Sequence, residues 1–213
     1  MNKDISSLRK EYTKLSLDVN DVDKNPLNTF NKWFDEALKS EVIEPNAMSL
    51  ATVDKNGIPA NRIVLLKEVD KGFVFYTNYQ SDKGRELEVN PVASINFFWP
   101  ELERQVRIQG NVEKVSEEMS TKYFQSRPKE SQIGAWTSPQ STAIKNRAIL
   151  EQRAKELAEK YKNDGVLPKP KQWGGYRVNP FHIEFWQGRP SRLHDRISYT
   201  LIDNQWKINR LAP

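Results

Sequence analysis

Apolar side chains follow two different spacings along the chain, and the first of them lies near residue 30. Between residues 26 and 38 the apolar positions fall three or four residues apart, at Leu27, Phe30, Trp33, Phe34, Ala37 and Leu38. This spacing gathers them on one face of a helix, and Pro26 is well suited to a first helical turn. The pattern therefore predicts an amphipathic helix.

After this segment the spacing changes to that of short strands. The β-rich runs before residue 116 are AMSLATVD, ANRIVLLKEV, GFVFYTN, VASINFFW and RQVRIQGNVEKV. Turn signals such as Asn56-Gly57 and Lys71-Gly72 separate them, and connections this short join antiparallel neighbours. Helical segments are expected at 116–126 and 142–161, and the runs YRV, HIEFWQG, RISYTLID and WKINRLA return to strands.

The order of these elements predicts the fold class. Seven or more short strands with few long crossovers favour a sandwich or a barrel, mainly β with flanking helices (α+β). Residues 1–24 are polar with little periodicity and are expected to form an N-terminal arm. Only KNDGVLPKPKQWGG resembles a linker, and it is short, so residues 25–213 are expected to form a single domain.

Composition narrows the class of protein and its compartment. The 213 residues are 37% hydrophobic and 10% aromatic, which is enough for a substantial core. The chain has no apolar run long enough to span a membrane, and its polar N-terminus lacks the apolar segment of a secretory signal. Cysteine is absent, which fits a reducing compartment. These features together predict a cytoplasmic protein.

Charge and motif content limit the possible chemistry. The net charge of +5 suits phosphorylated ligands, and also loose contact with nucleic acid. The chain lacks the glycine-rich phosphate loops and the G-x-S-x-G nucleophile elbow. With two histidines and no cysteine, no metal site is expected. If the chain is an enzyme, an organic cofactor is the simplest source of its chemistry.

The stretch EFWQGRPSRLHDR combines arginines with large aromatic rings. If RLHDR is a strand, Arg192, His194 and Arg196 share one face, where an anion would relieve their repulsion. A solvent-exposed strand face with acidic cross-strand partners is the alternative. Because Phe185 and Trp186 lie just upstream, a site for a flat anionic ligand is favoured.

Two other groups of residues could bind phosphate. Arg62 and Lys67 flank an apolar run at opposite parity, so either a bend intervenes or they serve different groups; both could also simply extend to solvent. Tyr123, Arg127 and Ser131 are four residues apart and share a helical face only if the helix continues past Pro128. Any surface helix could carry such a set.

Nine motifs, in order along nearly the whole chain, resemble the pyridoxine (pyridoxamine) 5'-phosphate oxidase family. They are RKEY, NRIVLLK, FYTN, ERQVRIQG, KYFQSRPKESQIGAW, SPQS, WGGYRV, IEFWQGRPSRLHDR and WKINRLAP. The resemblance implies a six-stranded antiparallel split β-barrel and a homodimer with FMN between the subunits. It implies oxidation of pyridoxine or pyridoxamine 5'-phosphate by O2 to pyridoxal 5'-phosphate, with release of H2O2.

The resemblance also implies roles for individual residues. The FMN site would comprise Arg62, Ile63, Val64, Leu65, Leu66, Lys67, Tyr76, Thr77, Lys83, Gln105, Gln140, Ser141, Trp186 and Arg196. The substrate site would comprise Arg9, Lys10, Glu11, Tyr12, Lys67, Tyr123, Arg127, Ser131, Arg192, Leu193 and His194, with Arg192 and His194 as the catalytic pair.

One position departs from the family pattern, and two rival functions stay open. Some family members have an arginine before the FMN lysine, where this chain has Asp82. One rival is a flavin-binding split barrel, a reductase or flavin-storage protein, with another substrate. The other is a nucleic-acid-binding β-barrel, for which the sequence offers no long basic tract.

Overall fold

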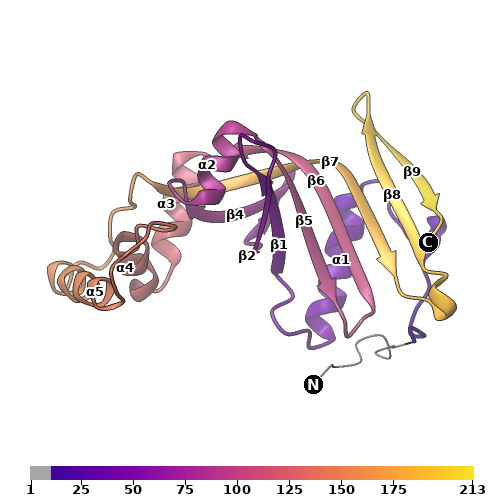
Figure 1. Cartoon of the computed structure of the whole chain (residues 1–213). Coiled ribbons are helices and arrows are strands. Elements are labelled where there is room, and N and C mark those ends of the chain that lie inside the picture. The colour runs from indigo at the N-terminus through magenta and orange to yellow at the C-terminus, as the bar shows by residue number, and fades with distance from the viewer. Residues whose placement is uncertain (1–10) are drawn as a thin grey trace, which may run out of the picture. The chain divides into compact units, whose positions relative to one another are not determined.

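The computed structural model describes residues 11–213, which form a β-sheet with helices beside it (Figure 1). The helices are α1 (Pro26–Lys39), α2 (Asp82–Val89), α3 (Glu117–Ser126), α4 (Lys129–Thr137) and α5 (Ala148–Lys160), with short 3-10 turns at Val19–Asp21 and Pro190–Arg192. The strands are β1 (Ala47–Val53), β2 (Pro59–Leu65), β3 (Glu68–Val69), β4 (Phe73–Asn78), β5 (Val92–Trp99), β6 (Arg104–Lys114), β7 (Trp173–Gln187), β8 (Asp195–Ile202) and β9 (Gln205–Leu211).

The described strands form one sheet in the order β2-β1-β5-β6-β7-β4-β3, and β8 pairs with both β7 and β9. The pairs β3/β4, β4/β7, β7/β8 and β8/β9 are antiparallel. The prediction of a mainly β chain with flanking helices is therefore confirmed. The nine strands exceed the six that the resemblance implied, and they include the two-residue β3.

The chain divides into two compact units. One holds residues 11–50 together with Ser94–Gly110 and Pro180–Pro213, and the other holds Ala51–Ala93 and Asn111–Asn179. The expectation of one domain over residues 25–213 stays a prediction. No helix among residues 11–213 has the length and apolar character needed to cross a bilayer.

In the first unit, α1 forms the core with aromatic residues of the sheet. The middle of its predicted apolar face is buried: the Phe30 ring lies 5.1 Å from Phe97, and the Trp33 ring lies 5.1 Å from Phe185. Leu38, at the end of that face, is exposed instead. Asn25 begins the helix because its side-chain oxygen accepts a hydrogen bond from the Leu27 N–H. Burial of such rings gives a large share of the hydrophobic stabilisation.

In the second unit, α3, α4 and α5 lie together (Figure 1). Their shared core is Phe124, Ile133, Leu167 and Trp173. The predicted helix at 116–126 is confirmed within one residue, whereas the one at 142–161 begins only at Ala148. Two helices, α2 and α4, were not expected.

Helix α2 was not predicted because it is short and its few apolar residues do not show a helical spacing. Leu87 is its one buried large apolar side chain, and it contains a glycine. Close packing requires glycine at position 84, because a Cβ there would lie 2.0 Å from the Tyr79 carbonyl oxygen. Ser81 begins the helix by accepting a hydrogen bond from the Gly84 N–H, which is the signal that was available in the sequence.

The condition that RLHDR is a strand is not met. Ser191 and Arg192 have φ values of 56° and 61°, in the left-handed region, and they follow Pro190 in a 3-10 turn. Strand β8 begins only at Asp195. Because a strand needs extended backbone, strand alternation cannot place Arg192 and His194 on one face with Arg196.

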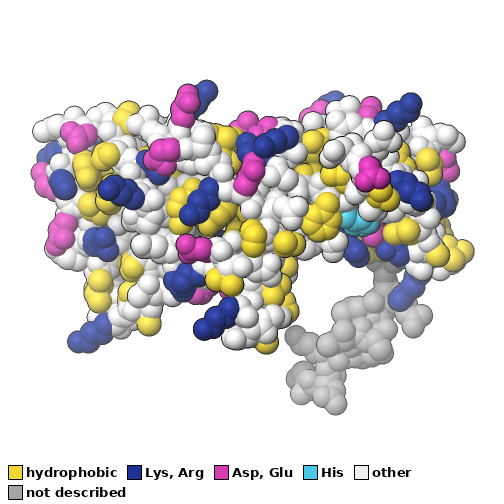
Figure 2. Space-filling model, turned by 90° about the horizontal axis from the view of Figure 1, so that it is seen from above, with side chains coloured by type: hydrophobic (Ala, Val, Ile, Leu, Met, Phe, Trp, Pro, Cys, Tyr) yellow, Lys and Arg dark blue, Asp and Glu magenta, His cyan; other side chains and the backbone are white. Residues whose placement is uncertain are grey.

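Charged side chains of both signs are interspersed over the molecular face drawn in Figure 2. On that face Lys and Arg side chains stand near Asp and Glu side chains rather than forming one broad basic area. Proteins that bind nucleic acid nonspecifically carry a continuous basic footprint. This face therefore gives the nucleic-acid alternative no support.

Candidate functional site

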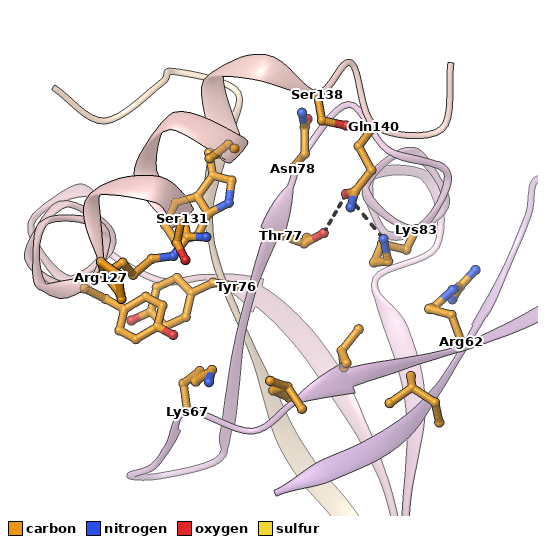
Figure 3. Close-up of a pocket in the computed structure, with 18 residues that line it drawn as sticks. Arg62, Lys67, Tyr76, Thr77, Asn78, Lys83, Arg127, Ser131, Ser138 and Gln140 are labelled. Atoms are coloured by element: carbon orange, nitrogen blue, oxygen red, sulfur yellow. Dashed lines mark hydrogen bonds between the residues drawn. The ribbon is translucent and has the colours of Figure 1, made fainter. Parts of the chain in front are cut away.

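The second unit contains a pocket of about 760 Å³ (Figure 3). Its walls come from β2, β4, α2, the α3–α4 junction, the segment after α4 and the start of β7. The lining residues are Arg62, Ile63, Val64, Leu65, Lys67, Tyr76, Thr77, Asn78, Lys83, Tyr123, Arg127, Pro128, Ser131, Gly134, Ala135, Ser138, Gln140 and Trp173.

The pocket is strongly cationic. Its described lining includes Arg62, Lys67, Lys83 and Arg127 but no aspartate or glutamate. In Figure 3, Arg127 and Ser131 lie at one end, Lys83 and Gln140 lie at the other, and Thr77 lies between them. Cations gathered in a concave, partly desolvated site attract anions more strongly than exposed cations do. The two ends can therefore hold two separate anionic groups.

The strand β2 and the segment after it bring Arg62 and Lys67 to the same pocket. β2 ends at Leu65 and β3 begins at Glu68, so Lys67 lies in the bend between two strands. Its backbone N–H donates to the Val74 carbonyl at 2.8 Å, which holds the bend against β4. A bend therefore intervenes between the two residues of this opposite-parity pair.

Lys83 is a buried lysine at one end of the pocket. The hydrogen bonds that its Nζ donates within residues 11–213 are both long, 3.4 Å to Ser81 Oγ and 3.5 Å to Gln140 Oε1. Burial, and next the Arg62 charge, lower the pKa of Lys83. Thr77 Oγ1 donates to the same Gln140 oxygen at 3.1 Å, as the dashed lines of Figure 3 show.

Arg62 is held differently from Lys83. Its Nη2 lies 3.0 Å from Glu86 Oε2, and its Nη1 donates to the Thr52 hydroxyl. Glu86 belongs to α2, so this ion pair fixes the guanidinium of β2 against that helix. The pair is largely buried.

Arg127 lies at the opposite end, between α3 and α4. Its Nη1 is buried and has no hydrogen-bond partner among the described residues. Burial lowers the pKa of this guanidinium, because a charged group loses its hydration. A buried donor without a partner is costly, and an anionic ligand would supply the missing acceptors.

An aromatic stack supports this end of the pocket. The Tyr76 ring lies 4.0 Å from Tyr123 and 5.4 Å from Trp173, centroid to centroid, with interplanar angles of 20° and 11°. Burial raises the pKa of Tyr76 to about 12, so its phenol stays protonated at physiological pH. Tyr123, Arg127 and Ser131 meet here although Arg127 and Pro128 interrupt the helix between them.

The other predicted flavin residues lie elsewhere. Leu66 is buried and does not line the pocket, and Ser141, at φ 65°, is exposed just past Gln140. Gln105, Trp186 and Arg196 belong to the first unit. There Arg196 forms an ion pair with Glu184.

The remaining predicted substrate residues also belong to the first unit. The Trp186 and His194 rings lie 4.6 Å apart, and the Tyr12 ring is 5.8 Å from His194. Glu11, Arg192 and Leu193 are exposed. Arg9 and Lys10 lie outside the described residues.

Six lining residues were not among the predicted site residues: Asn78, Pro128, Gly134, Ala135, Ser138 and Trp173. All six lie within the motifs FYTN, KYFQSRPKESQIGAW, SPQS and WGGYRV. Asn78 and Trp173 are paired across β4 and β7. The sequence alone does not give this strand register, so it could not place the two residues together. No group of three or more His, Cys, Asp or Glu side chains that could hold a metal ion occurs within residues 11–213.

Sequence comparison relates the chain to known proteins over its whole length. A model of the family described as "Pyridoxamine 5'-phosphate oxidase" matches residues 34–161, and one described as "Pyridoxine 5'-phosphate oxidase C-terminal dimerisation region" matches residues 173–213. The pyridoxine/pyridoxamine 5'-phosphate oxidase of Cyanothece sp. is 54% identical over 100% of both chains. That of Burkholderia mallei is 55% identical over 98% of this chain and 99% of its own.

Solved structures share the fold. PhzG from Burkholderia lata, in complex with tetrahydrophenazine-1-carboxylic acid, superposes with a TM-score of 0.89 at 31% identity, over 96% of this chain and 100% of its own. A pyridoxamine 5'-phosphate oxidase-related, FMN binding protein from Nostoc punctiforme gives 0.72 at 20% identity, over 90% of this chain and 100% of its own. The prediction of an antiparallel split barrel with flanking helices is thereby confirmed.

Proposed function

The chain belongs to the pyridoxamine 5'-phosphate oxidase family, and we propose that it oxidises pyridoxine 5'-phosphate and pyridoxamine 5'-phosphate with O2. The products are pyridoxal 5'-phosphate and H2O2; the amine substrate also consumes one water molecule and releases ammonia. The observation that carries this proposal is the pocket with four cationic side chains and no carboxylate, arranged so that both ends can receive an anion. Two phosphorylated ligands, a cofactor and a substrate, fit that arrangement.

The residues at the Lys83 end fit the phosphate of FMN. Lys83 is buried with only long hydrogen bonds, so an anion would restore its electrostatic balance. Arg62, Thr77 and Gln140 add donors around it, and Ile63, Val64 and Leu65 supply an apolar wall for a flat ring system. When bound, FMN supplies a hydride acceptor that O2 reoxidises.

Arg127, Tyr123, Ser131 and Lys67 are proposed to hold the substrate phosphate. The support is the buried Nη1 of Arg127, which has no partner among the described residues, next to two hydroxyl groups that line the same pocket. A guanidinium binds phosphate in a bidentate manner, and hydroxyls complete the shell. This set would fix one end of the substrate, so that its ring is presented in one orientation.

We further propose a homodimer in which Gln105, Trp186 and Arg196 complete the flavin site and Arg192 and His194 face the substrate. The match of residues 173–213 to a dimerisation region supports this assembly. The proposal also includes Ser141 in the flavin site, and Glu11, Tyr12 and Leu193 at the substrate, together with Arg9 and Lys10 outside the described residues. A cytoplasmic location is part of the same proposal and is compatible with the cysteine-free composition.

His194 is proposed to act as a hydrogen-bond donor. Its Nδ1 accepts from the Arg189 backbone N–H at 3.1 Å, so the neutral ring carries its proton on Nε2. Burial, and next the Arg192 charge, lower the pKa of His194 and favour that neutral form. Arg192 is proposed to orient the substrate and to contribute charge, because a guanidinium offers hydrogen-bond donors and no acceptor.

An anaerobic mixing experiment tests the proposed function. Holoenzyme is mixed with pyridoxine 5'-phosphate without O2, and flavin absorbance near the visible maximum is followed. We expect the yellow colour to bleach and to return on admission of air with stoichiometric H2O2. Unphosphorylated pyridoxine at the same concentration is the control and should bleach the flavin far more slowly. A protein that stays yellow with both phosphorylated substrates would refute the oxidase.

One observation favours a second candidate, a flavin-dependent oxidation of another aromatic ligand. PhzG, at 31% identity, was crystallised with tetrahydrophenazine-1-carboxylic acid, which also combines fused rings with an acidic group. The chain's identity to the pyridoxine/pyridoxamine 5'-phosphate oxidases is much higher, at 54–55%. Bleaching by phenazine precursors but not by phosphorylated vitamers would favour the second candidate.

A further inference from the structure

Trp173 contacts several of the groups that line the Arg127 end of the pocket. It is the first residue of β7, and its ring stacks on Tyr76 at 5.4 Å and on Tyr123 at 6.1 Å, with interplanar angles of 11° and 9°. The Tyr76 and Tyr123 rings also stack on each other at 4.0 Å. The three rings are therefore nearly parallel, so the orientation of each tyrosine depends on the indole.

Arg127 rests on the same indole. Its Cζ lies 4.8 Å from the Trp173 ring centroid and 5.8 Å from the Phe124 ring centroid. No carboxylate pairs with Arg127 in the part of the chain that the structure describes, so the cation–π contact is its main attractive support. Tyr123 and Arg127, two of the four proposed phosphate ligands, thus share one support.

The backbone around Trp173 is fixed by its own contacts. The Nζ of Lys169, a side chain only 2% exposed, donates to the Trp173 carbonyl at 2.7 Å and pairs with Glu117 at 3.0 Å. Two residues later, a Cβ on Gly175 would lie 2.8 Å from the Tyr76 ring. The glycine therefore leaves the space that the stacked tyrosine fills.

We propose that Trp173 is a positioning residue, which acts through Tyr123 and Arg127 to set the site's preference for a phosphorylated ligand. This inference rests on the proposed function, because it assumes that these two side chains bind the substrate phosphate. Without the indole, the guanidinium loses its support and the Tyr123 ring loses one stacking partner. The phosphate group, rather than the reacting end of the substrate, then loses binding free energy.

The test compares two substitutions at this position, Trp173→Phe and Trp173→Leu. Calorimetry on holoenzyme gives the affinity for pyridoxal 5'-phosphate and for pyridoxal, which lacks the phosphate. We expect Trp173→Leu to weaken binding of the phosphorylated ligand about tenfold, equivalent to about 1.4 kcal/mol, and that of pyridoxal less than about twofold. Trp173→Phe keeps an aromatic ring and should retain most of the preference. With pyridoxine 5'-phosphate as substrate, KM should rise while kcat changes little.

A matched control is Trp136→Leu. Trp136 packs against the same core cluster, and its Nε1 donates to the Pro168 carbonyl at 2.8 Å, but it does not line the pocket. Trp136→Leu should lower thermal stability without changing the ratio of the affinities for pyridoxal 5'-phosphate and pyridoxal. The inference is overturned if Trp173→Leu weakens both ligands equally, or if Trp136→Leu reproduces the selective loss. A wild-type protein with no preference for the phosphorylated ligand would instead overturn the proposed function.

Discussion

Glu184 accepts hydrogen bonds from both Nε and Nη2 of Arg196, at 2.9 and 3.0 Å, and its side chain is only 2% exposed. The second cation near this carboxylate is Arg107, at 3.4 Å. The remaining Arg196 nitrogen, Nη1, donates to the Ala212 carbonyl at 2.7 Å. Arg196, a proposed flavin ligand, is thus held in a defined orientation by a buried carboxylate.

Substituting Arg196 and substituting Glu184 should lower the free energy of unfolding by different amounts. In Arg196→Ala the buried Glu184 carboxylate keeps Arg107, which is a more distant partner. We therefore expect a loss of about 3 kcal/mol in the free energy of unfolding. Glu184→Gln leaves arginines that reach solvent, and it should cost only about 1–2 kcal/mol. Urea unfolding of both variants, without FMN, measures the difference. Equal losses would show that burial of Glu184 is not the deciding factor.

Lys83→Met should separate stability from cofactor affinity. Removal of a buried cation that has only long hydrogen bonds should raise the melting temperature of the apoprotein by about 2–4 °C, equivalent to about 1 kcal/mol. FMN affinity should fall at least about tenfold, because the phosphate loses a charged partner. Fluorescence of released FMN measures the second effect. The exposed Lys55→Met is the control, and a lower apoprotein melting temperature for Lys83→Met would contradict this account.

Arg127→Lys keeps the charge at the Arg127 end of the pocket but removes the planar fork. We expect KM for pyridoxine 5'-phosphate to rise about tenfold, with kcat within about twofold of wild type. Steady-state oxygen consumption measures both constants. Arg153→Lys, an exposed position on α5, should change neither. A decrease confined to kcat would mean that Arg127 acts on the reacting centre.

Arg192→Lys tests the role of the guanidinium group at a residue whose backbone has an uncommon conformation. Arg192 has φ 61°, and lysine pays the same backbone cost as arginine there, so stability should stay within about 0.5 kcal/mol. If the guanidinium orients the substrate, kcat should fall at least about tenfold. Stopped-flow reduction of the flavin checks the chemical step directly. Normal turnover and normal affinity together would exclude an orienting role.

The lowered pKa of His194 predicts a loss of stability at acidic pH. The folded state resists protonation of this ring, so the unfolded state binds more protons once the pH falls below about 6.5. The contribution is therefore fully present above that pH and is lost as the pH decreases towards the folded-state pKa. Urea unfolding of wild type and His194→Asn between pH 7.5 and pH 5, roughly the range over which histidine titrates, measures it.

His182 provides the comparison for that measurement. Burial also lowers its pKa, so it contributes a pH dependence of the same sign. His194→Asn should remove only part of the acid destabilisation, and His182→Asn should remove a further part. If the His194 variant keeps the whole wild-type slope, the neutral folded state of that ring is not supported.

The sequence predicted the elements whose burial follows a regular period. The residues of β1 alternate between buried and partly buried, and α1 buries Phe30, Trp33 and Ala37 on one face. Such patterns are local, so they can be read before the fold is known. The turn at Ser191 and Arg192 could not be read in this way, because neither residue type signals a left-handed conformation.

The candidate site was predictable only in part, for a related reason. Family motifs pointed to Lys83 and Arg127, which line the same pocket although they are far apart in the chain. The roles of Trp173 and Glu184 depend on which side chains meet across strands and helices. Neither the order of motifs nor residue spacing contains that information, so these two residues emerge only from the structure.

Two glycines mark where the shape of the pocket can and cannot be altered. Gly175 does not itself line the pocket, but an added methyl group there would press on the ring of Tyr76, which does, so this position tolerates no larger side chain. At Gly134, which lines the pocket from α4, an added methyl group meets nothing within 4 Å. Redesign of the protein for smaller ligands should therefore begin at position 134, where alanine would fill empty space and also strengthen the helix.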